Sequence, residues 1–159
     1  MIRVLIVDDH QIVRRGLKEI FADEFADLNV GEAETSKAAL ELVMTQDWDI
    51  VLLDINIPGR NGLEVLEEVK RLRPRTPVLV LSAYPEEEFA IRALKGGASG
   101  YLNKSRASDE LLAGVKKVLA GGRYVTASLP ERLAAEKITG RHLPEVAIVT
   151  FSLLLQGRD

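Results

Sequence analysis

Two adjacent acids, Asp8 and Asp9, directly follow the apolar segment Val4–Val7 near the start of the chain. Neighbouring carboxylates repel one another and are costly to remove from water, so this pair needs a compensating charge. A third acid, Asp54, ends the apolar run Ile50–Leu53. Three carboxylates that converge at one place suit a hard divalent cation such as Mg²⁺, which takes oxygen ligands and is often held by one or two carboxylates.

Two more polar residues follow apolar runs in the same way. Ser82 comes after Val78–Leu81, and Lys104 lies just past Gly100–Leu102. With a cation in place, one carboxylate can attack a phosphoryl group, because the metal shares the developing charge. A lysine could then pair with one phosphoryl oxygen while a hydroxyl hydrogen-bonds another. The set of five residues therefore predicts a phosphoryl group carried on an aspartate.

The elements that must position these residues alternate between two types. Short apolar runs, some of them rich in Val and Ile, are typical of strands buried on both faces of a parallel sheet. Longer segments with apolar residues at helical spacing separate them. We expect strands at Val4–Val7, Asn29–Ala33, Ile50–Leu53, Val78–Leu81 and Gly100–Leu102, and helices within residues 12–21, 38–43, 63–72, 86–94 and 108–119.

This alternation predicts a doubly wound α/β domain with right-handed crossovers. Ligands of such sheets bind outside the carboxyl ends of the strands. All five polar residues lie at or just beyond strand ends, so we expect them to meet on one rim of the sheet.

Four stretches, VLIVDDH, VLLDINIPGRNGLEVL, VLVLSAY and GASGYLNKS, resemble the receiver domain of a two-component response regulator. The resemblance covers residues 1–120 or nearly so, and it implies a flavodoxin-like fold with a five-stranded parallel sheet in the order 2-1-3-4-5. It implies that Asp54 is the phosphoacceptor for the phosphohistidine of a sensor histidine kinase. It also implies that Asp9 and Asp54 bind Mg²⁺ directly, with Asp8 acting through water.

The remaining roles also come from the resemblance. The backbone carbonyl of Asn56 would complete the metal ligands, and Lys104 would contact the phosphoryl group. Ser82 would turn toward the modified aspartate, and Tyr101 would swing inward behind it. The change would emerge on the face formed by the fourth helix, fifth strand and fifth helix, and would favour a homodimer or release a DNA-binding domain. Such a protein assists its own phosphotransfer and dephosphorylation and is not otherwise an enzyme.

Each feature also has an alternative interpretation. The two leading acids could form a solvated turn that caps a helix, Tyr101 could be an ordinary half-buried aromatic, and His10 could ligate a transition metal beside the acids. The domain could be an interaction module that works without phosphorylation. It could also be an aspartyl-phosphate phosphohydrolase of the haloacid-dehalogenase type, but that class places a DxDx[TV] motif after the first strand, which is not the pattern here.

The segment GGRYVTASLPERLA resembles the linker of the NarL/FixJ subfamily, whose output domain is a LuxR-type helix-turn-helix. We expect a linker with one short helix over residues 121–141 and a remnant or first helix of the output domain over residues 142–159. The expected Arg-Glu pair is replaced by Val146 and Ala147, and the sequence ends at Asp159 before a recognition helix. We therefore expect DNA to be read only through a complete output domain and not by this chain.

Composition excludes several classes of site and partner. The chain has 159 residues, 47% hydrophobic and 28% charged, with a net charge of −3, so no general affinity for nucleic acid follows. It has no cysteine, which excludes disulfides and thiolate zinc sites. Its apolar runs are too short for a signal peptide or a membrane span. We expect a soluble cytoplasmic protein with no membrane partner.

Overall fold

The computed structural model describes residues 1–59, 61–83, 86–104 and 107–125. Strands and helices alternate along the chain, as the sequence predicts. The expected short helix of the linker and the expected output segment lie outside the described residues. The elements are β1 (Ile2–Val7), α1 (Gln11–Glu24), β2 (Leu28–Ala33), α2 (Ser36–Thr45), β3 (Ile50–Asp54), α3 (Gly62–Leu72), β4 (Val78–Ser82), α4 (Glu86–Lys95), β5 (Gly100–Asn103), α5 (Ala107–Leu119) and β6 (Tyr124–Val125).

The strands form one parallel sheet in the order β2-β1-β3-β4-β5-β6. The predicted order of the first five strands is confirmed. Strand β3 lies at the centre, and all five of its residues, IVLLD, are buried. A continuous apolar run fits this position, because helices cover both faces of a central parallel strand. Asp54 is therefore carried to the carboxyl edge of the sheet by a strand that is buried along its whole length.

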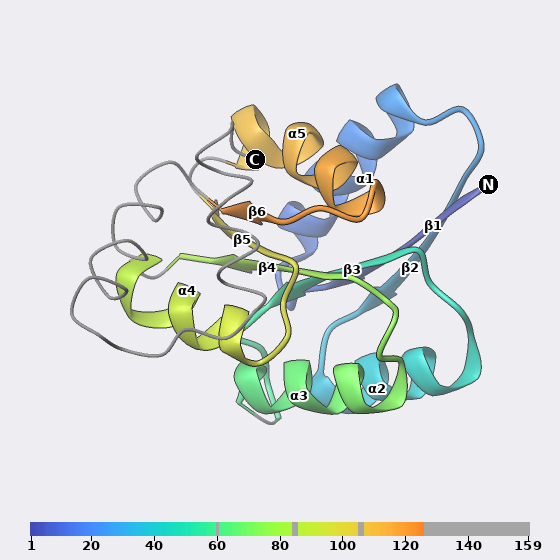
Figure 1. Ribbon diagram of the computed structural model, residues 1–159. Helices are drawn as coiled ribbons and strands as arrows, with labels where there is room; N and C mark the ends of the chain where they lie inside the picture. The colour runs from blue at the N-terminus through green and yellow to red at the C-terminus, as the bar shows by residue number, and fades with distance from the viewer. Residues whose placement is uncertain (60, 84–85, 105–106, 126–159) are drawn as a thin grey trace.

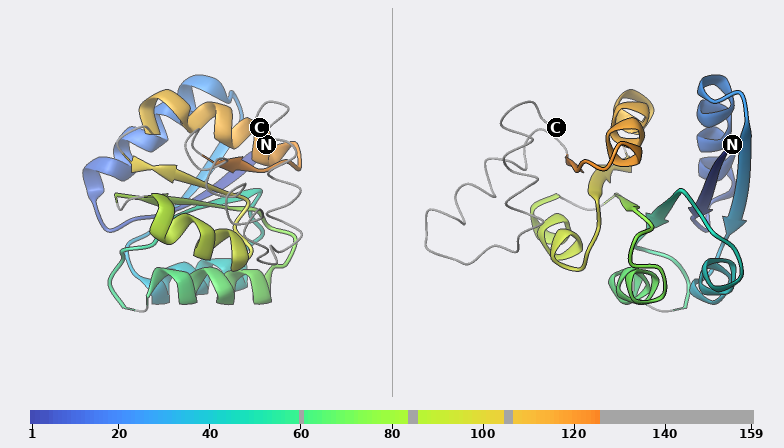
Figure 2. Two further views of the ribbon diagram at one scale, coloured as in Figure 1. Left: turned by 60° about the vertical axis from the view of Figure 1, so that its left-hand side comes forward. Right: turned by 45° about the vertical axis from the view of Figure 1, so that its right-hand side comes forward.

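Helices α1 and α5 cover one face of the sheet, and α2, α3 and α4 cover the other (Figure 1; Figure 2). Side chains alternate between the two faces because successive strand residues point in opposite directions. In β1, Val4 and Ile6 pack with α1 and α5, whereas Leu5 and Val7 pack toward α2 and α3. The acids that follow β1 thus start from a strand end that is fixed by core packing on both sides.

Two helices near the site begin at side-chain caps. Thr35 accepts a hydrogen bond from the Ala38 backbone N–H at 3.1 Å where α2 begins. Asn61 accepts one from the Leu63 backbone N–H at 2.8 Å where α3 begins. Such caps satisfy backbone donors that a helix leaves unpaired at its N-terminus. The cap at Asn61 sets the start of α3 a few residues after Asp54.

The sheet has a sixth strand that the sequence analysis did not predict, because β6 is only two residues long and lies in the stretch assigned to the linker. Gly121 has φ +93 and ends α5 in a conformation that glycine adopts readily. The Tyr124 N–H then donates to the Ser99 carbonyl at 3.0 Å. At Gly100, a Cβ would lie 2.3 Å from the Tyr124 carbonyl oxygen, so the absent side chain lets the two strands meet.

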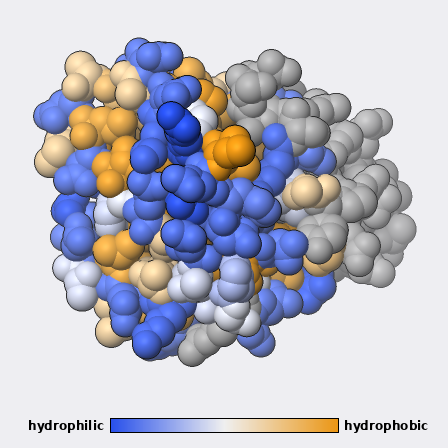
Figure 3. Space-filling view, turned by 180° about the vertical axis from the view of Figure 1, so that it is seen from behind, coloured by the Kyte–Doolittle hydropathy of each residue, from blue (hydrophilic) through white to orange (hydrophobic). Residues whose placement is uncertain are grey.

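The surface of the described residues carries few large apolar side chains, and only Met1, Ile12 and Met44 are strongly exposed. On the face seen in Figure 3, hydrophobic residues form scattered groups among hydrophilic ones. In the described part of the chain, no helix has the length and apolar character needed to cross a bilayer.

Candidate functional site

Asp8 and Asp9 leave the carboxyl end of β1 and differ in exposure. Asp8 is buried, with 1% of its surface exposed, whereas 32% of the Asp9 side chain is exposed. The backbone N–H of Asp8 donates to the Ala33 carbonyl at 3.0 Å, which extends the pairing of β1 with β2 by one residue. The His10 backbone N–H donates to Asp8 Oδ1 at 2.8 Å. These bonds hold the carboxylate of Asp8 at the rim of the sheet.

Asp54 ends β3 with its carboxylate held at both oxygens. The Asn56 backbone N–H donates to Oδ1 at 3.0 Å, and Lys104 Nζ donates to Oδ2 at 3.0 Å. Lys104 Nζ also lies 2.8 Å from Asp8 Oδ2. One ammonium group, carried just past β5, therefore links the carboxylates that end β1 and β3, and the structure brings Asp8, Asp54 and Lys104 together as the sequence predicts.

The charge of Lys104 is stabilised by the acids around it. Partial burial of Lys104 opposes ionisation, but the hydrogen bonds that its ammonium donates to Asp8 and Asp54 outweigh that cost, so the pKa of Lys104 is raised. Only 18% of its side chain is exposed. The amine is therefore a permanent cation at neutral pH, positioned where negative charge gathers.

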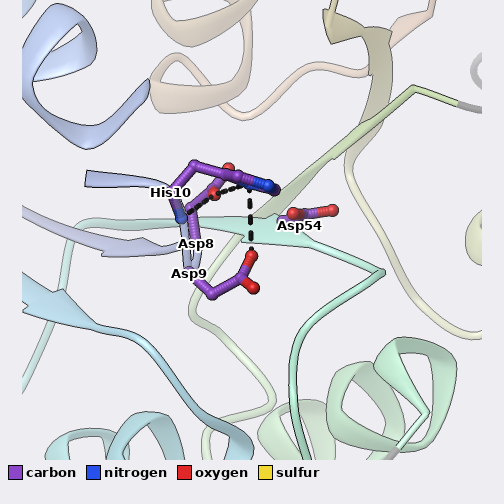
Figure 4. A group of neighbouring side chains, drawn as sticks. All are labelled: Asp8, Asp9, His10 and Asp54. Carbon is purple, nitrogen blue, oxygen red and sulfur yellow. Dashed lines mark hydrogen bonds and ion pairs between the residues drawn. The ribbon is translucent and has the colours of Figure 1, made fainter. Parts of the chain in front are cut away.

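The acidic cluster fits a divalent cation. Ligand atoms from Asp8, Asp9, His10 and Asp54 all lie within 4.8 Å of one another (Figure 4). Asp9 Oδ1 is shielded from solvent and accepts no hydrogen bond. Three carboxylates and one ammonium leave two negative charges uncompensated. An acidic cluster of this kind, rich in carboxylate oxygen and lacking thiolate, is typical of Mg²⁺ binding.

His10 borders the same cluster from the solvent side. Its Nδ1 lies 3.0 Å from Asp8 Oδ1 and 3.2 Å from Asp9 Oδ1, and 61% of its side chain is exposed (Figure 4). The ring thus faces two carboxylates that the sequence analysis assigns to a cation. The one imidazole in the cluster is outnumbered by carboxylates, which favours a metal that prefers oxygen.

Ser82 and Tyr101 lie inside the domain. Ser82 ends β4 next to β3, where Asp54 pairs in register with Leu81, and its side chain is buried. Tyr101 is completely buried in the core on the α4 side of the sheet. Tyr101 is therefore more deeply buried than the half-buried aromatic of the alternative interpretation. The reason is that β6 pairs with β5 at this position and covers its edge. In this structure the ring already lies inside the domain.

Sequence reasoning missed Arg14, which is buried although it is charged. Its Nη1 donates to the Asp8 carbonyl at 2.6 Å, and its Nε donates to Glu32 Oε1 at 2.8 Å. Glu32 also accepts a bond from Lys18 at 2.8 Å, so the guanidinium belongs to a network between α1 and β2. A signal was available: position 14 lies in helical register with Leu17 and Phe21, the buried stripe of α1.

The chain is similar to a known family over most of its length. A model for the response regulator receiver domain matches residues 4–116. Response regulator GacA of Pseudomonas aeruginosa is 35% identical over 134 residues, which make up 84% of this chain and 63% of that protein. Transcriptional regulatory protein DegU of Brevibacillus brevis is 39% identical over 135 residues, or 85% of this chain and 57% of that protein. The chain thus spans less than two thirds of the length of these curated relatives.

Solved structures show the same similarity. A two-component response regulator of the LuxR family from Aurantimonas sp. SI85-9A1 superposes with a TM-score of 0.78 and 30% identity, over 86% of this chain and 97% of that one. A LuxR family DNA-binding response regulator from Silicibacter pomeroyi gives a TM-score of 0.72 and 31% identity, over 80% and 99% of the two chains.

Proposed function

This chain belongs to the response regulator receiver family, and from that premise we propose that Asp54 accepts a phosphoryl group from a phosphohistidine of a sensor histidine kinase. The observation that carries the proposal is the position of the Asp54 carboxylate. It is 2% exposed, ends the central strand, and is held between the Asn56 N–H and Lys104. A buried carboxylate that is fixed on two sides and faces two further acids is oriented for in-line attack.

The chemistry transfers phosphorus from nitrogen to oxygen. A carboxylate oxygen of Asp54 forms the new P–O bond, while the P–N bond of the phosphohistidine breaks and its electron pair returns to the imidazole, which then takes up a proton. Lys104, already beside Asp54 Oδ2, neutralises the charge that builds on the phosphoryl oxygens. In our proposal the buried hydroxyl of Ser82, which ends the neighbouring strand, hydrogen-bonds the product.

We propose Mg²⁺ as the cofactor of this step. Asp9 and Asp54 would hold it directly, Asp8 would act through water, and the backbone carbonyl of Asn56 would complete the protein ligands. The bound cation would spread the negative charge that develops during phosphoryl transfer. The shielded Oδ1 of Asp9 supports this assignment, because it accepts no hydrogen bond and its neighbour is the Nδ1 of His10 at 3.2 Å. A shielded carboxylate oxygen that accepts no hydrogen bond is costly unless a cation faces it.

We infer that phosphorylation switches the domain and that the complete protein controls transcription. Names among the relatives describe a transcriptional regulatory protein and a DNA-binding response regulator. In our proposal Ser82 turns toward the phosphoryl group and Tyr101 responds behind it, which favours a homodimer. DNA is then bound through a complete LuxR-type output domain.

The receiver domain assists only its own phosphotransfer and dephosphorylation. We also propose a cytoplasmic location for this protein, because the kinase that would supply its phosphoryl group uses ATP.

Incubation with acetyl phosphate and Mg²⁺, followed by intact-mass measurement, tests the proposal. We expect one phosphoryl adduct on the wild type and none on Asp54→Asn. Asp23→Asn, which changes an exposed aspartate of α1, is the matched control and keeps the adduct. Light scattering on the same samples checks for the dimer.

Three other outcomes contradict the proposal. A wild-type chain that never gains the adduct would favour an interaction module that works without phosphorylation. Rapid turnover of many phosphate esters would favour a phosphohydrolase. An adduct that persists in Asp54→Asn would assign the phosphoacceptor to another residue.

A further inference from the structure

A second cavity lies at the opposite edge of the sheet from the acidic cluster. It has a volume of about 530 Å³. Four of its lining residues each stand immediately before a parallel strand, which places the cavity at the amino edge. They are Asp49 before β3, Pro77 before β4, Ser99 before β5 and Arg123 before β6. Asp54 and Lys104 lie at the carboxyl edge of the same sheet, so the two sites are separate.

Three cations converge on this cavity and one acid lines it. Lys70 comes from the last turn of α3, Arg75 from the α3–β4 connection, and Arg123 from the turn after α5, together with Asp49. Within the described ranges, none of the three cations forms an ion pair. Lys70 Nζ donates to the Thr76 carbonyl at 2.8 Å, and Nε of Arg123 is shielded from solvent without an acceptor.

Lys70 and Arg123 are partly withdrawn from water and lie near each other, whereas Arg75 is exposed. Burial lowers the pKa of Lys70, and the nearby charge of Arg123 lowers it further. Burial also lowers the pKa of Arg123. Cations in such surroundings are costly unless an anion compensates them. The free domain therefore bears an unfavourable electrostatic arrangement at this edge.

The negative ends of nearby helices do not cancel the positive charge of the cavity. The C-termini of α3, α4 and α5 point toward this edge, and each supplies roughly half a negative charge. Three such ends offset about one and a half charges, whereas three cations and one acid leave two positive charges. The local field stays positive, and an anion in the cavity would be attracted.

We propose that this cavity binds a small phosphorylated anion, such as a diphosphate or a phosphate monoester. A phosphate monoester carries about −1.5 to −2 charges at neutral pH, close in magnitude to the two positive charges that the side chains leave before the helix ends are counted. Arg supplies a planar fork and Lys a point charge, the two groups that commonly hold phosphate. The volume lies within the range of roughly 300–1,000 Å³ that is usual for small-molecule sites.

The cavity is lined by residues from four connections, α2–β3, α3–β4, α4–β5 and α5–β6, so a ligand would tie them together. Gly97, with φ +107, lies in the α4–β5 connection beside Lys70, and Arg123 leads into β6. A bound anion would stabilise the folded domain by an amount that grows with the logarithm of its free concentration once that concentration exceeds the Kd. Binding here does not involve Asp54, and the proposal stands independently of phosphoryl transfer.

Titration of the full, uniformly ¹⁵N-labelled chain with inorganic pyrophosphate, without Mg²⁺, tests the site. We expect saturable shifts of the Gly97, Gly121 and Arg123 amides. Arg123→Gln should weaken binding about tenfold or more, equivalent to about 1.4 kcal/mol or more. Arg15→Gln removes the same charge from an exposed position on α1 and should change affinity less than about twofold. Asp54→Asn should bind like the wild type.

Folding and specificity need their own checks. Thermal melting shows whether Arg123→Gln is folded, and Lys70→Gln provides a second variant with the same expected loss of binding. Absence of saturation up to about 10 mM pyrophosphate would overturn the proposal, because it corresponds to less than about 3 kcal/mol of binding energy. Amide shifts confined to Asp54 and Asn56 would also overturn it. The same holds for equal pyrophosphate affinity of Arg123→Gln and Arg15→Gln, or for an affinity for succinate equal to that for pyrophosphate.

Discussion

The guanidinium of Arg14 donates a hydrogen bond from Nη1 to the backbone carbonyl of Asp8 at 2.6 Å. This bond joins the first helix to the strand end that carries the two leading acids. The same side chain donates to Glu32 on β2 at 2.8 Å, so one buried cation connects three elements beside the site. A cation that is buried and saturated with acceptors fixes geometry in a way that an apolar residue could not.

Replacing Arg14 should therefore damage stability and the site together. Arg14→Met removes the donor to the Asp8 carbonyl and leaves Glu32 with Lys18 but without Arg14, and we expect the free energy of unfolding to fall by about 2–4 kcal/mol. Urea denaturation measures this loss. We also expect phosphorylation by acetyl phosphate to slow by about tenfold. Arg15→Met, at an exposed position of the same helix, should stay within about 0.5 kcal/mol of the wild type. Equal stability of the two variants would contradict this role.

Glu32 should contribute stability that depends on pH. Hydrogen bonds from Lys18 and Arg14 lower the pKa of Glu32 in the folded chain. The stabilisation is therefore present above its ordinary pKa of about 4.3 and is lost as pH falls through the lower folded value. Because Glu32 is partly exposed, we expect Glu32→Gln to cost only about 0.5–1 kcal/mol at pH 7. Urea denaturation should show this difference shrink as pH falls below the ordinary pKa of about 4.3, and a difference that does not shrink on acidification would refute the assignment.

Lys104 should offset the repulsion between the acids. Lys104→Met leaves Asp8 and Asp54 facing each other, and we expect a loss of about 2–3 kcal/mol without metal, less than for a fully buried pair. If the acids bind Mg²⁺, the cation should raise the melting temperature of this variant more than that of the wild type. Lys37→Met, at an exposed position on α2, is the control. Identical responses of all three proteins to Mg²⁺ would argue against a cation among these carboxylates.

The stabilising effect of Lys104 should be lost at alkaline pH. The pKa of Lys104 is raised by folding, so its stabilisation is complete below the ordinary value of about 10.4 and is lost as pH rises through the folded value. The stability gap between the wild type and Lys104→Met should narrow above about pH 10.4. Denaturation in urea at pH 9 and at pH 11, each roughly one unit from that pKa, measures the gap. A stability difference between the two proteins that widens at pH 11 would contradict the raised pKa of Lys104.

Gly62 should not tolerate a side chain. A Cβ there would lie 2.2 Å from the Cα of Ile55, in the connection that follows Asp54. Gly62→Ala must displace this backbone, and we expect it to cost about 1–3 kcal/mol and to slow phosphorylation. Gly16→Ala in α1 meets no atom within 4 Å and should raise stability by about 0.5–1 kcal/mol. Melting curves of both variants test the contrast, and a neutral Gly62→Ala would show that the connection can move.

Local patterns in the sequence were sufficient to predict the sheet and the edge that carries the acids. The apolar run Ile50–Leu53 predicts a strand buried on both faces, and strand β3 is buried throughout. In a parallel sheet the carboxyl ends of neighbouring strands share one edge, so Asp8 and Asp54 were expected to meet before any coordinates were known. The inference works because strand burial and strand direction are properties of short segments.

Other features depend on contacts between distant segments, which no local pattern encodes. Arg14 looks like one more charge on an amphipathic helix until Glu32 and the Asp8 carbonyl surround it. The two-residue strand β6 has too few residues to show a period, and it forms because Gly100 leaves room for the Tyr124 carbonyl. Local patterns in the sequence thus determined the first five strands, the five helices and the acidic edge, and the resemblance to receiver domains supplied the order of those strands. Only the tertiary structure decided which charges are paired and buried, since pairing and burial are set by side chains that meet across the fold.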